Sequence, residues 1–228
     1  MSIEIIPVFC NDSNMANYAY IVKETQSSEC IIIDAAEPRP LMTKLQALNI
    51  TPTHILTTHH HFDHVGGNLE LKQKYQLKII APKSEQHMVP GADMGISEGQ
   101  NLDIGNLHFE IIDAPGHTLG HILYYLKPAN SLFTGDVLFN LSIGGLFEGT
   151  EKQMFDSLEK IKALPDNTKI FPGHEYTHAG ITQTLLRHPD FAEYLKKMNL
   201  RREGKSAPAT LAEEKQFNPY LNEDFFNI

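Results

Sequence analysis

Four histidines lie within the six residues 59–64, directly after the apolar pair Ile55-Leu56 and just before Gly66-Gly67. The chain has 12 histidines in 228 residues, so a window of six would hold about 0.3 by chance. An apolar run that ends in polar residues and a glycine pair is typical of a loop between a strand and a helix. The segment therefore predicts a cluster of imidazoles, with one carboxylate, at the end of a strand.

Metal binding explains this segment better than packing or solvation does. Imidazole and carboxylate together are a ligand mixture that zinc and iron favour. Alternate side chains of an extended stretch point the same way, so we expect His59, His61 and Asp63 to converge. His64 should turn aside toward a second point, and His60 should face away and is left out of the ligand set. The alternatives are a solvated histidine-rich loop or a fragment of a purification tag, which would lie at a terminus.

Three downstream segments share one form, an apolar run that ends in a polar residue beside glycine. They are Ala114-Pro115-Gly116-His117, Phe133-Thr134-Gly135-Asp136 and Phe171-Pro172-Gly173-His174. Taken singly, such a residue is more often structural, because Asp and Gly are common in turns. Together they supply the missing ligands, and a set of this size with a bridging carboxylate suits two ions rather than one. The predicted ligands are His59, His61, Asp63, His64, His117, Asp136 and His174.

Short apolar runs alternate with turn residues through the first two thirds of the chain. Strands are predicted at Ile3–Phe9, Tyr18–Val22, Cys30–Ile33, His54–Thr57, Leu77–Ala81, Leu107–Ile112, Ile122–Leu126 and Ser131–Thr134. Helices are predicted at Leu41–Leu48, Asn68–Tyr75 and Glu151–Leu164. The last is the clearest, because Thr150 and Gln153 stand where a capping box would place them. Strands interspersed with helices favour an α/β fold, an αββα sandwich with mixed sheets, over a plain doubly wound sheet.

The pattern changes after Pro172. Helix-forming stretches at Ile181–Arg187 and Phe191–Arg202 are followed by a tail that contains Gly and Pro and runs to Ile228. We therefore expect a main domain over residues 1–174 and a short helical subdomain over residues 175–228.

Composition narrows the partners and the location. The chain carries a net charge of −9, which repels nucleic acid and anionic lipid. It begins without a signal-peptide pattern and has no apolar run long enough to cross a membrane. Cys10 and Cys30 are its only cysteines and lie in no C-x-x-C pair, so we expect both to be reduced and structural. A cytoplasmic location and a small-molecule substrate follow as expectations.

The motif series resembles that of a known family. THHHFDH, PGHT, TGD and GHEY are similar to the metallo-β-lactamase superfamily, and THHHFDHVGGN, GDVLF, FEGT and GHEYT resemble its hydroxyacylglutathione hydrolase (glyoxalase II) family. The similarity runs from residue 1 to about residue 221. It implies the αββα sandwich, a first metal on His59, His61 and His117, a second on Asp63, His64 and His174, and Asp136 as the bridge. We expect two divalent ions per chain, with zinc first and iron or manganese as alternatives.

The resemblance also implies a reaction, the hydrolysis of S-D-lactoylglutathione to D-lactate and glutathione. Water activated by the two ions would attack the thioester carbonyl, with Asp63 and Asp136 as the catalytic carboxylates. A thiolate, with a thiol pKa of about 8.5, leaves with little help from an acid. A thioester therefore suits the expected site.

Substrate contacts are where the chain departs from this family. Gly145 stands where the family carries a Lys or Arg for the glutathione carboxylate, and Phe147 stands for a tyrosine of some members. Tyr176 matches another glutathione-contacting tyrosine, with a packed ring and a backbone-bonded hydroxyl as the structural alternative. The family's C-terminal helical domain is also longer. Gly145, Phe147 and Tyr176 are the predicted substrate-binding residues.

Other functions remain open on the same scaffold. A lactonase or an iron persulfide dioxygenase would share the H-x-H-x-D-H core, and fold and ligands do not separate them from a thioesterase. A class B β-lactamase is less favoured, because Asp136 is expected to bridge. The non-enzymatic alternative is a metal-binding module, against which the complete ligand set argues.

Overall fold

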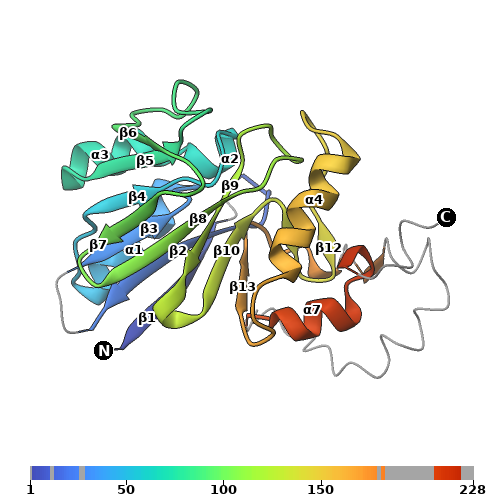
Figure 1. The fold of residues 1–228 in the computed structure, drawn as a ribbon. Helices are drawn as coiled ribbons and strands as arrows, with labels where there is room; N and C mark the ends of the chain where they lie inside the picture. The colour runs from blue at the N-terminus through green and yellow to red at the C-terminus, as the bar shows by residue number, and fades with distance from the viewer. Residues whose placement is uncertain (1, 11–12, 26–28, 179–180, 183–207, 222–228) are drawn as a thin grey trace.

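Two β-sheets face each other, and helices cover the outer face of each (Figure 1). The computed structural model describes residues 2–10, 13–25, 29–178, 181–182 and 208–221. One outer layer contains α1 (Pro38–Leu48) and α3 (Asn68–Tyr75), and the other contains α4 (Glu151–Lys162) and α7 (Leu211–Phe217). The predicted αββα sandwich is confirmed.

The first sheet has six strands in the order β1-β2-β3-β4-β5-β6. Their bounds are β1 Ile3–Cys10, β2 Asn17–Glu24, β3 Cys30–Ile33, β4 His54–Leu56, β5 Lys78–Pro82 and β6 Met94–Ile96. The first three pair antiparallel, whereas β3 to β6 pair parallel. Parallel neighbours need a crossover connection. Helix α1 supplies the one between β3 and β4, and α2 (Phe62–Val65) with α3 supplies the next.

The second sheet has five strands in the order β13-β10-β9-β8-β7. Their bounds are β7 Asn101–Ile104, β8 Leu107–Asp113, β9 Ile122–Leu126, β10 Ser131–Gly135 and β13 Lys169–Pro172. All pairs are antiparallel except β10 with β13, whose crossover contains α4. A small hairpin, β11 (Leu138–Phe139) and β12 (Ser142–Ile143), follows β10, and single 3-10 turns occur at η1 (Lys127–Ala129) and η2 (Pro219–Leu221).

Aromatic rings fill the space between the sheets. The ring of Tyr20 on β2 lies 5.4 Å from Phe133 and 5.4 Å from Phe171, both on the opposite sheet. Strand β2 is buried on both faces: Tyr20 and Val22 face the second sheet, while Ile21 packs on the α1 side. Burial of both faces explains why the strands read as continuous apolar runs rather than as alternating ones.

Most predicted elements are confirmed to within one or two residues, with the exception of α1, which begins earlier. Helix α4 begins with the expected capping box, since Thr150 and Gln153 each bond the other's backbone. Strands β6, β7, β11 and β12 were not predicted, and β13 was anticipated only as the apolar run before His174. Helix α7 corrects the expected C-terminal tail: it carries a second capping box, Thr210 with Glu213, and packs Leu211 on the second sheet.

Residues 59–64 and the segment after residue 174 were also covered by predictions. The extended course expected for residues 59–64 is wrong, because α2 begins at Phe62 and Asp63 lies in its first turn. The predicted helices Ile181–Arg187 and Phe191–Arg202 lie outside the described residues except for 181–182. The division into residues 1–174 and 175–228 stays a prediction. Within the described residues, every helix is too short or too polar to be a bilayer-spanning segment.

One edge of the sandwich gathers the ends of strands from both sheets. Strands β3, β4, β8, β10 and β13 all end there, and β2 begins there. The two sheets are hydrogen-bonded to each other at this edge, since Tyr18 N donates to Gly173 O at 2.8 Å and Ile122 N to Thr58 O at 3.0 Å. Residues that follow these strands therefore meet at a braced corner of the fold.

Candidate metal centre

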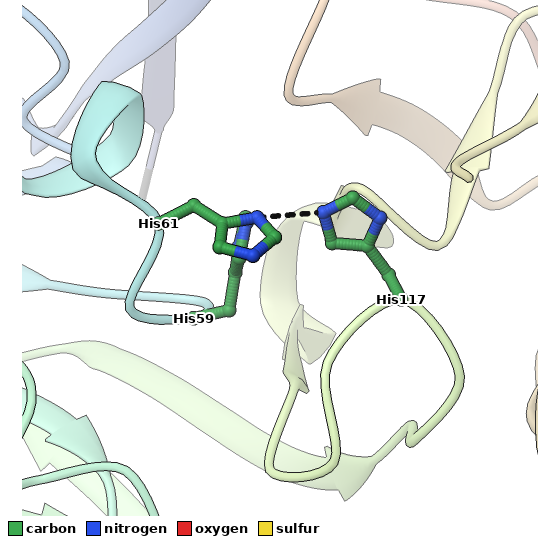
Figure 2. A group of neighbouring side chains, drawn as sticks. All are labelled: His59, His61 and His117. Atoms are coloured by element: carbon green, nitrogen blue, oxygen red, sulfur yellow. Dashed lines mark hydrogen bonds between the residues drawn. The ribbon is translucent and has the colours of Figure 1, made fainter. Parts of the chain in front are cut away.

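All seven predicted ligands meet at this corner. Three overlapping groups bring one nitrogen or oxygen atom of each member within 4.8 Å of the others: His59, His61 and His117; His59, His64 and Asp136; Asp63, His64 and His174. The two groups without Asp136 are called here the first and the second half-site. His59 and His61 follow β4 and His117 lies between β8 and β9, yet their rings converge (Figure 2).

The first half-site is closely packed. His61 Nδ1 lies 2.9 Å from His117 Nε2, and the His59 ring lies 4.7 Å from His61 and 5.0 Å from His117. His59 Nε2 is buried and has no hydrogen-bond partner among the described residues. Three ring nitrogens thus face a common point from three directions.

The second half-site has the same character. His64 Nε2 lies 3.2 Å from His174 Nε2, and Asp63 Oδ2 lies 3.3 Å from His174 and 3.6 Å from His64. The extended-strand argument placed Asp63 beside His59 and His61, whereas the family resemblance placed it with His64 and His174. The turn of α2 instead carries its carboxylate to the second half-site, together with His64.

Asp136 lies between the two half-sites. Its Oδ1 is 3.2 Å from His64 Nε2. Its Oδ2 is 3.2 Å from His174 Nε2 and 3.4 Å from His117 Nε2. One buried carboxylate therefore reaches ligands of both half-sites, which is the arrangement a bridging ligand requires.

The opposite edge of four imidazoles is tied to an acceptor. Nδ1 of His117 donates to Gly145 O at 2.7 Å, and Nδ1 of His174 donates to Met15 O at 2.7 Å. Nδ1 of His64 lies 3.0 Å from Asp34 Oδ2. These bonds fix the orientation of each ring and point its Nε2 at the centre.

His59 is held by a relay of the same kind. Thr58 Oγ1 donates to Asp34 Oδ2 at 2.8 Å, so it accepts from His59 Nδ1 at 3.0 Å. Asp34 also accepts from the Thr58 amide at 2.8 Å. A single buried carboxylate thus orients His59 and His64, one from each half-site.

Charge in the centre favours cations. Burial would raise the pKa of the Asp63 and Asp136 carboxyls, but the facing histidines outweigh it and hold both pKa values well below the ordinary range. Burial would lower the pKa of His174, but the hydrogen bonds that His174 donates to the Asp136 and Asp63 carboxylates raise it to about 9. The pKa of His64 is likewise raised, chiefly by Asp136 against burial.

The remaining histidines stay neutral. Burial first, and neighbouring histidines second, lower the pKa of His59 and His61, and burial lowers that of His117. Because His117 Nδ1 donates to Gly145 O, His117 Nε2 can accept a hydrogen bond from His61 Nδ1 at 2.9 Å, and a bound cation would take the place of that proton. Neutral imidazole and ionised carboxylate are the forms that bind a metal. The residues present therefore fit divalent metal ions.

Three supporting residues were missed by sequence reasoning. They are Asp34, which follows β3 and adopts φ 52°, Asn17, whose amide bonds Asp63, and His121, whose Nε2 accepts from the Asp136 amide at 3.1 Å. The signal for Asp34 was its place after the apolar run Cys30–Ile33, at the same strand edge as the ligands. His121 stood four residues after His117 and was passed over.

His60 points away from Asp136, as expected. Its Nδ1 lies 2.9 Å from Glu85 Oε2 and its Nε2 lies 3.4 Å from Glu148 Oε1. His60, His61 and Glu148 also form a more exposed cluster that could hold an ion. His61 Nδ1, however, belongs to the first half-site.

The three predicted substrate residues border the centre. The ring of Phe147 lies edge-on to His61 at 5.5 Å and to His117 at 5.1 Å, although 72% of Phe147 is exposed. Gly145 takes part through its carbonyl. The ring of Tyr176 stacks on His174 at 4.5 Å, and its hydroxyl donates to Met15 O at 2.9 Å.

Comparisons with known proteins agree with this geometry. A family model described as the metallo-beta-lactamase superfamily matches residues 14–174. A hydroxyacylglutathione hydrolase of Rhodospirillum rubrum is 42% identical over 213 residues, which cover 91% of this chain and 83% of the relative. One of Mesorhizobium japonicum is 39% identical over 226 residues, with 97% and 88% covered.

Solved structures share the fold. The BLEG-1 B3 metallo-beta-lactamase superposes with a TM-score of 0.77 at 24% identity, covering 96% of this chain and 100% of its own. TTHA1623, solved in a di-iron-bound form, superposes with a TM-score of 0.69 at 25% identity, with 95% and 100% covered.

Proposed function

This chain belongs to the metallo-β-lactamase superfamily and, within it, to the hydroxyacylglutathione hydrolase family, and from that premise we propose that it hydrolyses S-D-lactoylglutathione to D-lactate and glutathione. The protein is a hydrolase of that superfamily. The observation that carries the proposal is the convergence of all seven predicted ligands at one corner of the sandwich. Relatives about 40% identical over most of the chain are named for this reaction.

The proposal includes two divalent ions per chain, with zinc first and iron or manganese as alternatives. His59, His61 and His117 would hold one, Asp63, His64 and His174 the other, and Asp136 would touch both. The place of Asp136 between the half-sites supports two ions, as does the di-iron form of TTHA1623. Divalent ions bound there supply Lewis-acid polarisation and lower the pKa of a water molecule toward about 7.

Asp63 and Asp136 are proposed as the catalytic carboxylates. Facing histidines keep both ionised, so each oxygen can accept a hydrogen bond. Asp63 Oδ2 is fixed by Asn17 Nδ2 at 3.0 Å, which holds the carboxylate in one orientation. In that orientation Asp63 can accept a proton of the attacking water and direct its lone pair toward the thioester carbonyl.

The leaving group needs little from the protein. A thiolate with a thiol pKa of about 8.5 departs without protonation near neutral pH. The residues that face it must therefore bind it rather than donate a proton. Hydrolysis of an ester or an amide would need a proton donor for the leaving group, because alkoxides and amines are far more basic than a thiolate.

The thiol side of the site is assigned to Phe147, Gly145 and Tyr176. The exposed ring of Phe147 offers an apolar surface beside His61 and His117. The Tyr176 hydroxyl donates its hydrogen bond to Met15 O, so toward the substrate its oxygen can only accept one. Gly145 provides no cation for the glutathione carboxylate, so we propose that the thiol is bound weakly, with a high KM.

The proposal also covers location and partners. Cys10 and Cys30 are buried thiols rather than a disulfide, which supports a reducing compartment such as the cytoplasm. The net charge of −9 supports a small-molecule substrate over nucleic acid.

Three parallel assays on the metal-loaded protein test the reaction. We expect rapid release of thiol from S-D-lactoylglutathione, little opening of an acyl lactone, and no oxygen consumption with glutathione persulfide. Chelation should abolish the hydrolysis and added zinc should restore it. Oxygen consumption, or lactone turnover faster than thioester turnover, would replace the proposal with the corresponding alternative.

A further inference from the structure

The amide of Asn17, the first residue of β2, lies against the second half-site. Asn17 is 1% exposed. Its Nδ2 donates to the backbone carbonyl of Asp63 and to Asp63 Oδ2, both at 3.0 Å. It also lies 3.4 Å from His174 Nε2. One buried side chain therefore contacts two of the three ligands of this half-site.

The backbone around Asn17 holds the same ligands. Asn17 and His174 form an isolated antiparallel bridge, and Glu175 N donates to Ala16 O at 2.9 Å. Met15 O accepts from His174 Nδ1 at 2.7 Å. Ala16 adopts φ 53°, a left-handed conformation that residues with a side chain seldom take. The turn before β2 therefore holds His174 through backbone hydrogen bonds.

The first half-site has separate supports. His117 is held by Gly145 O and His59 by Thr58 Oγ1. Neither contact involves the turn before β2. A change at Asn17 should therefore act on one half-site and spare the other.

We propose that Asn17 is a positioning residue that sets the affinity of the second half-site for its ion, an inference that rests on the proposed two-ion function. An amide suits this role because it donates to the Asp63 carboxylate without carrying a charge that would repel the ion. Because Asn17 already holds the Asp63 carboxylate in one orientation, the carboxylate need not be ordered when the ion binds. Loss of such an outer partner weakens metal binding by about 10- to 100-fold.

Zinc-loaded protein titrated with a fluorescent zinc chelator tests the inference, since it counts the ions released per chain. In Asn17→Leu, which replaces the amide by an apolar group of similar size, we expect one ion to leave at a chelator concentration about 10-fold or more below that of the wild type. The other ion should leave as in the wild type. Asn68→Leu is the matched control, because Asn68 is 0% exposed and its Nδ2 bonds Pro90 O at 3.4 Å, not a ligand.

If Asn17→Leu does not fold, the same chelator titration is done on Asn17→Ala. It adds no bulk, and a water molecule can replace part of the lost donor, so its loss of affinity should fall between those of the wild type and Asn17→Leu. Equal weakening of both ions, or release indistinguishable from the Asn68 control, would refute the role of Asn17. A wild type that holds one ion would instead refute the two-ion function itself.

Discussion

Gly144 and Gly145 are adjacent glycines with opposite tolerance for a side chain. A Cβ on Gly144 would overlap the carbonyl oxygen of Asp136. A Cβ on Gly145 meets only the ring of Phe147, at 3.3 Å, and the Gly145 backbone lies outside the left-handed region. The His117 contact uses the Gly145 carbonyl, which a side chain leaves in place. Position 145 is thus open to substitution and position 144 is closed.

We expect Gly145→Lys to improve the hydrolysis of glutathione thioesters by restoring a cation for the glycine carboxylate. A hydrogen bond to a charged group contributes about 1.5–3 kcal/mol and a partly exposed ion pair about 0.2–1 kcal/mol, so kcat/KM should rise about 2- to 20-fold. The gain should appear in KM and should shrink as salt is added.

Two controls accompany this change. Thioesters of a small thiol without the carboxylate should gain nothing, and Gly144→Ala should lose activity on every substrate. An equal gain on both thiol classes would show that position 145 does not face the thiol.

At the scale of residues, the sequence predicted which side chains converge at the centre but not the residues that support them. His117 and Asp136 could be found because a Gly turn at a strand end places a polar side chain at the rim. Asn17 and Asp34 act through hydrogen bonds to residues 46 and 30 positions away, and such distant partners leave no local pattern. The strand-based grouping of Asp63 with His59 and His61 was wrong because α2 begins at Phe62, and a four-residue helix is too short to show a helical period in the sequence.

At the scale of elements, α7 holds the hairpin that follows Asp136. Glu214 Oε2 accepts from Leu141 N at 3.0 Å and from Asn218 Nδ2 at 2.9 Å. Leu141, between β11 and β12, adopts φ 61°. Phe139 of that hairpin packs against His174 with ring centroids 5.7 Å apart. A buried carboxyl on a C-terminal helix therefore supports a strained loop beside the metal centre.

Glu214 should make stability depend on pH. Burial raises the pKa of Glu214 to about 7, above its value of about 4.3 in an unfolded chain. Between these values the folded state holds a proton that the unfolded state has lost, so the free energy of unfolding falls as pH rises from about 4.3 to about 7. At 1.36 kcal/mol per pH unit the loss is about 3–4 kcal/mol.

Urea unfolding at pH 5 and pH 8 measures this effect. Glu214→Gln keeps an acceptor for Leu141 and Asn218 but cannot ionise, so its stability should fall less than that of the wild type between the two pH values. Glu70→Gln, exposed on α3, should behave as the wild type does. Parallel pH profiles for the wild type and Glu214→Gln would contradict the assignment.

Helices and strands could be predicted where apolar residues recur over a long enough stretch of sequence. Helix α4 was read correctly from its apolar face and its capping box. Helix α7 was missed because its seven residues are mostly polar, although Thr210 and Glu213 gave the same capping signal. Strand β6 has three residues, and two of them are not buried. Its extended conformation therefore depends on pairing with β5 and not on its composition.

For the whole molecule, the sandwich explains why ligands 115 residues apart in the chain can meet, from His59 to His174. Parallel pairing brings the ends of β3 and β4 to one edge, and the parallel pair β10 and β13 brings Asp136 and His174 to the same edge. Apolar runs predicted strands but could not give their order, because both faces are buried and periodicity is lost. The arrangement of sheets came from the family resemblance, and the comparisons confirm it.

The proposed reaction requires two ions that act together on a thioester. Chelator-treated protein, given zinc in steps, allows the rate of S-D-lactoylglutathione hydrolysis to be plotted against zinc bound per chain. We expect the rate to keep rising beyond one bound ion and to reach its maximum at two, because Asp136 lies between two half-sites that share the work. A full rate with one bound ion, or no hydrolysis with two, would contradict it.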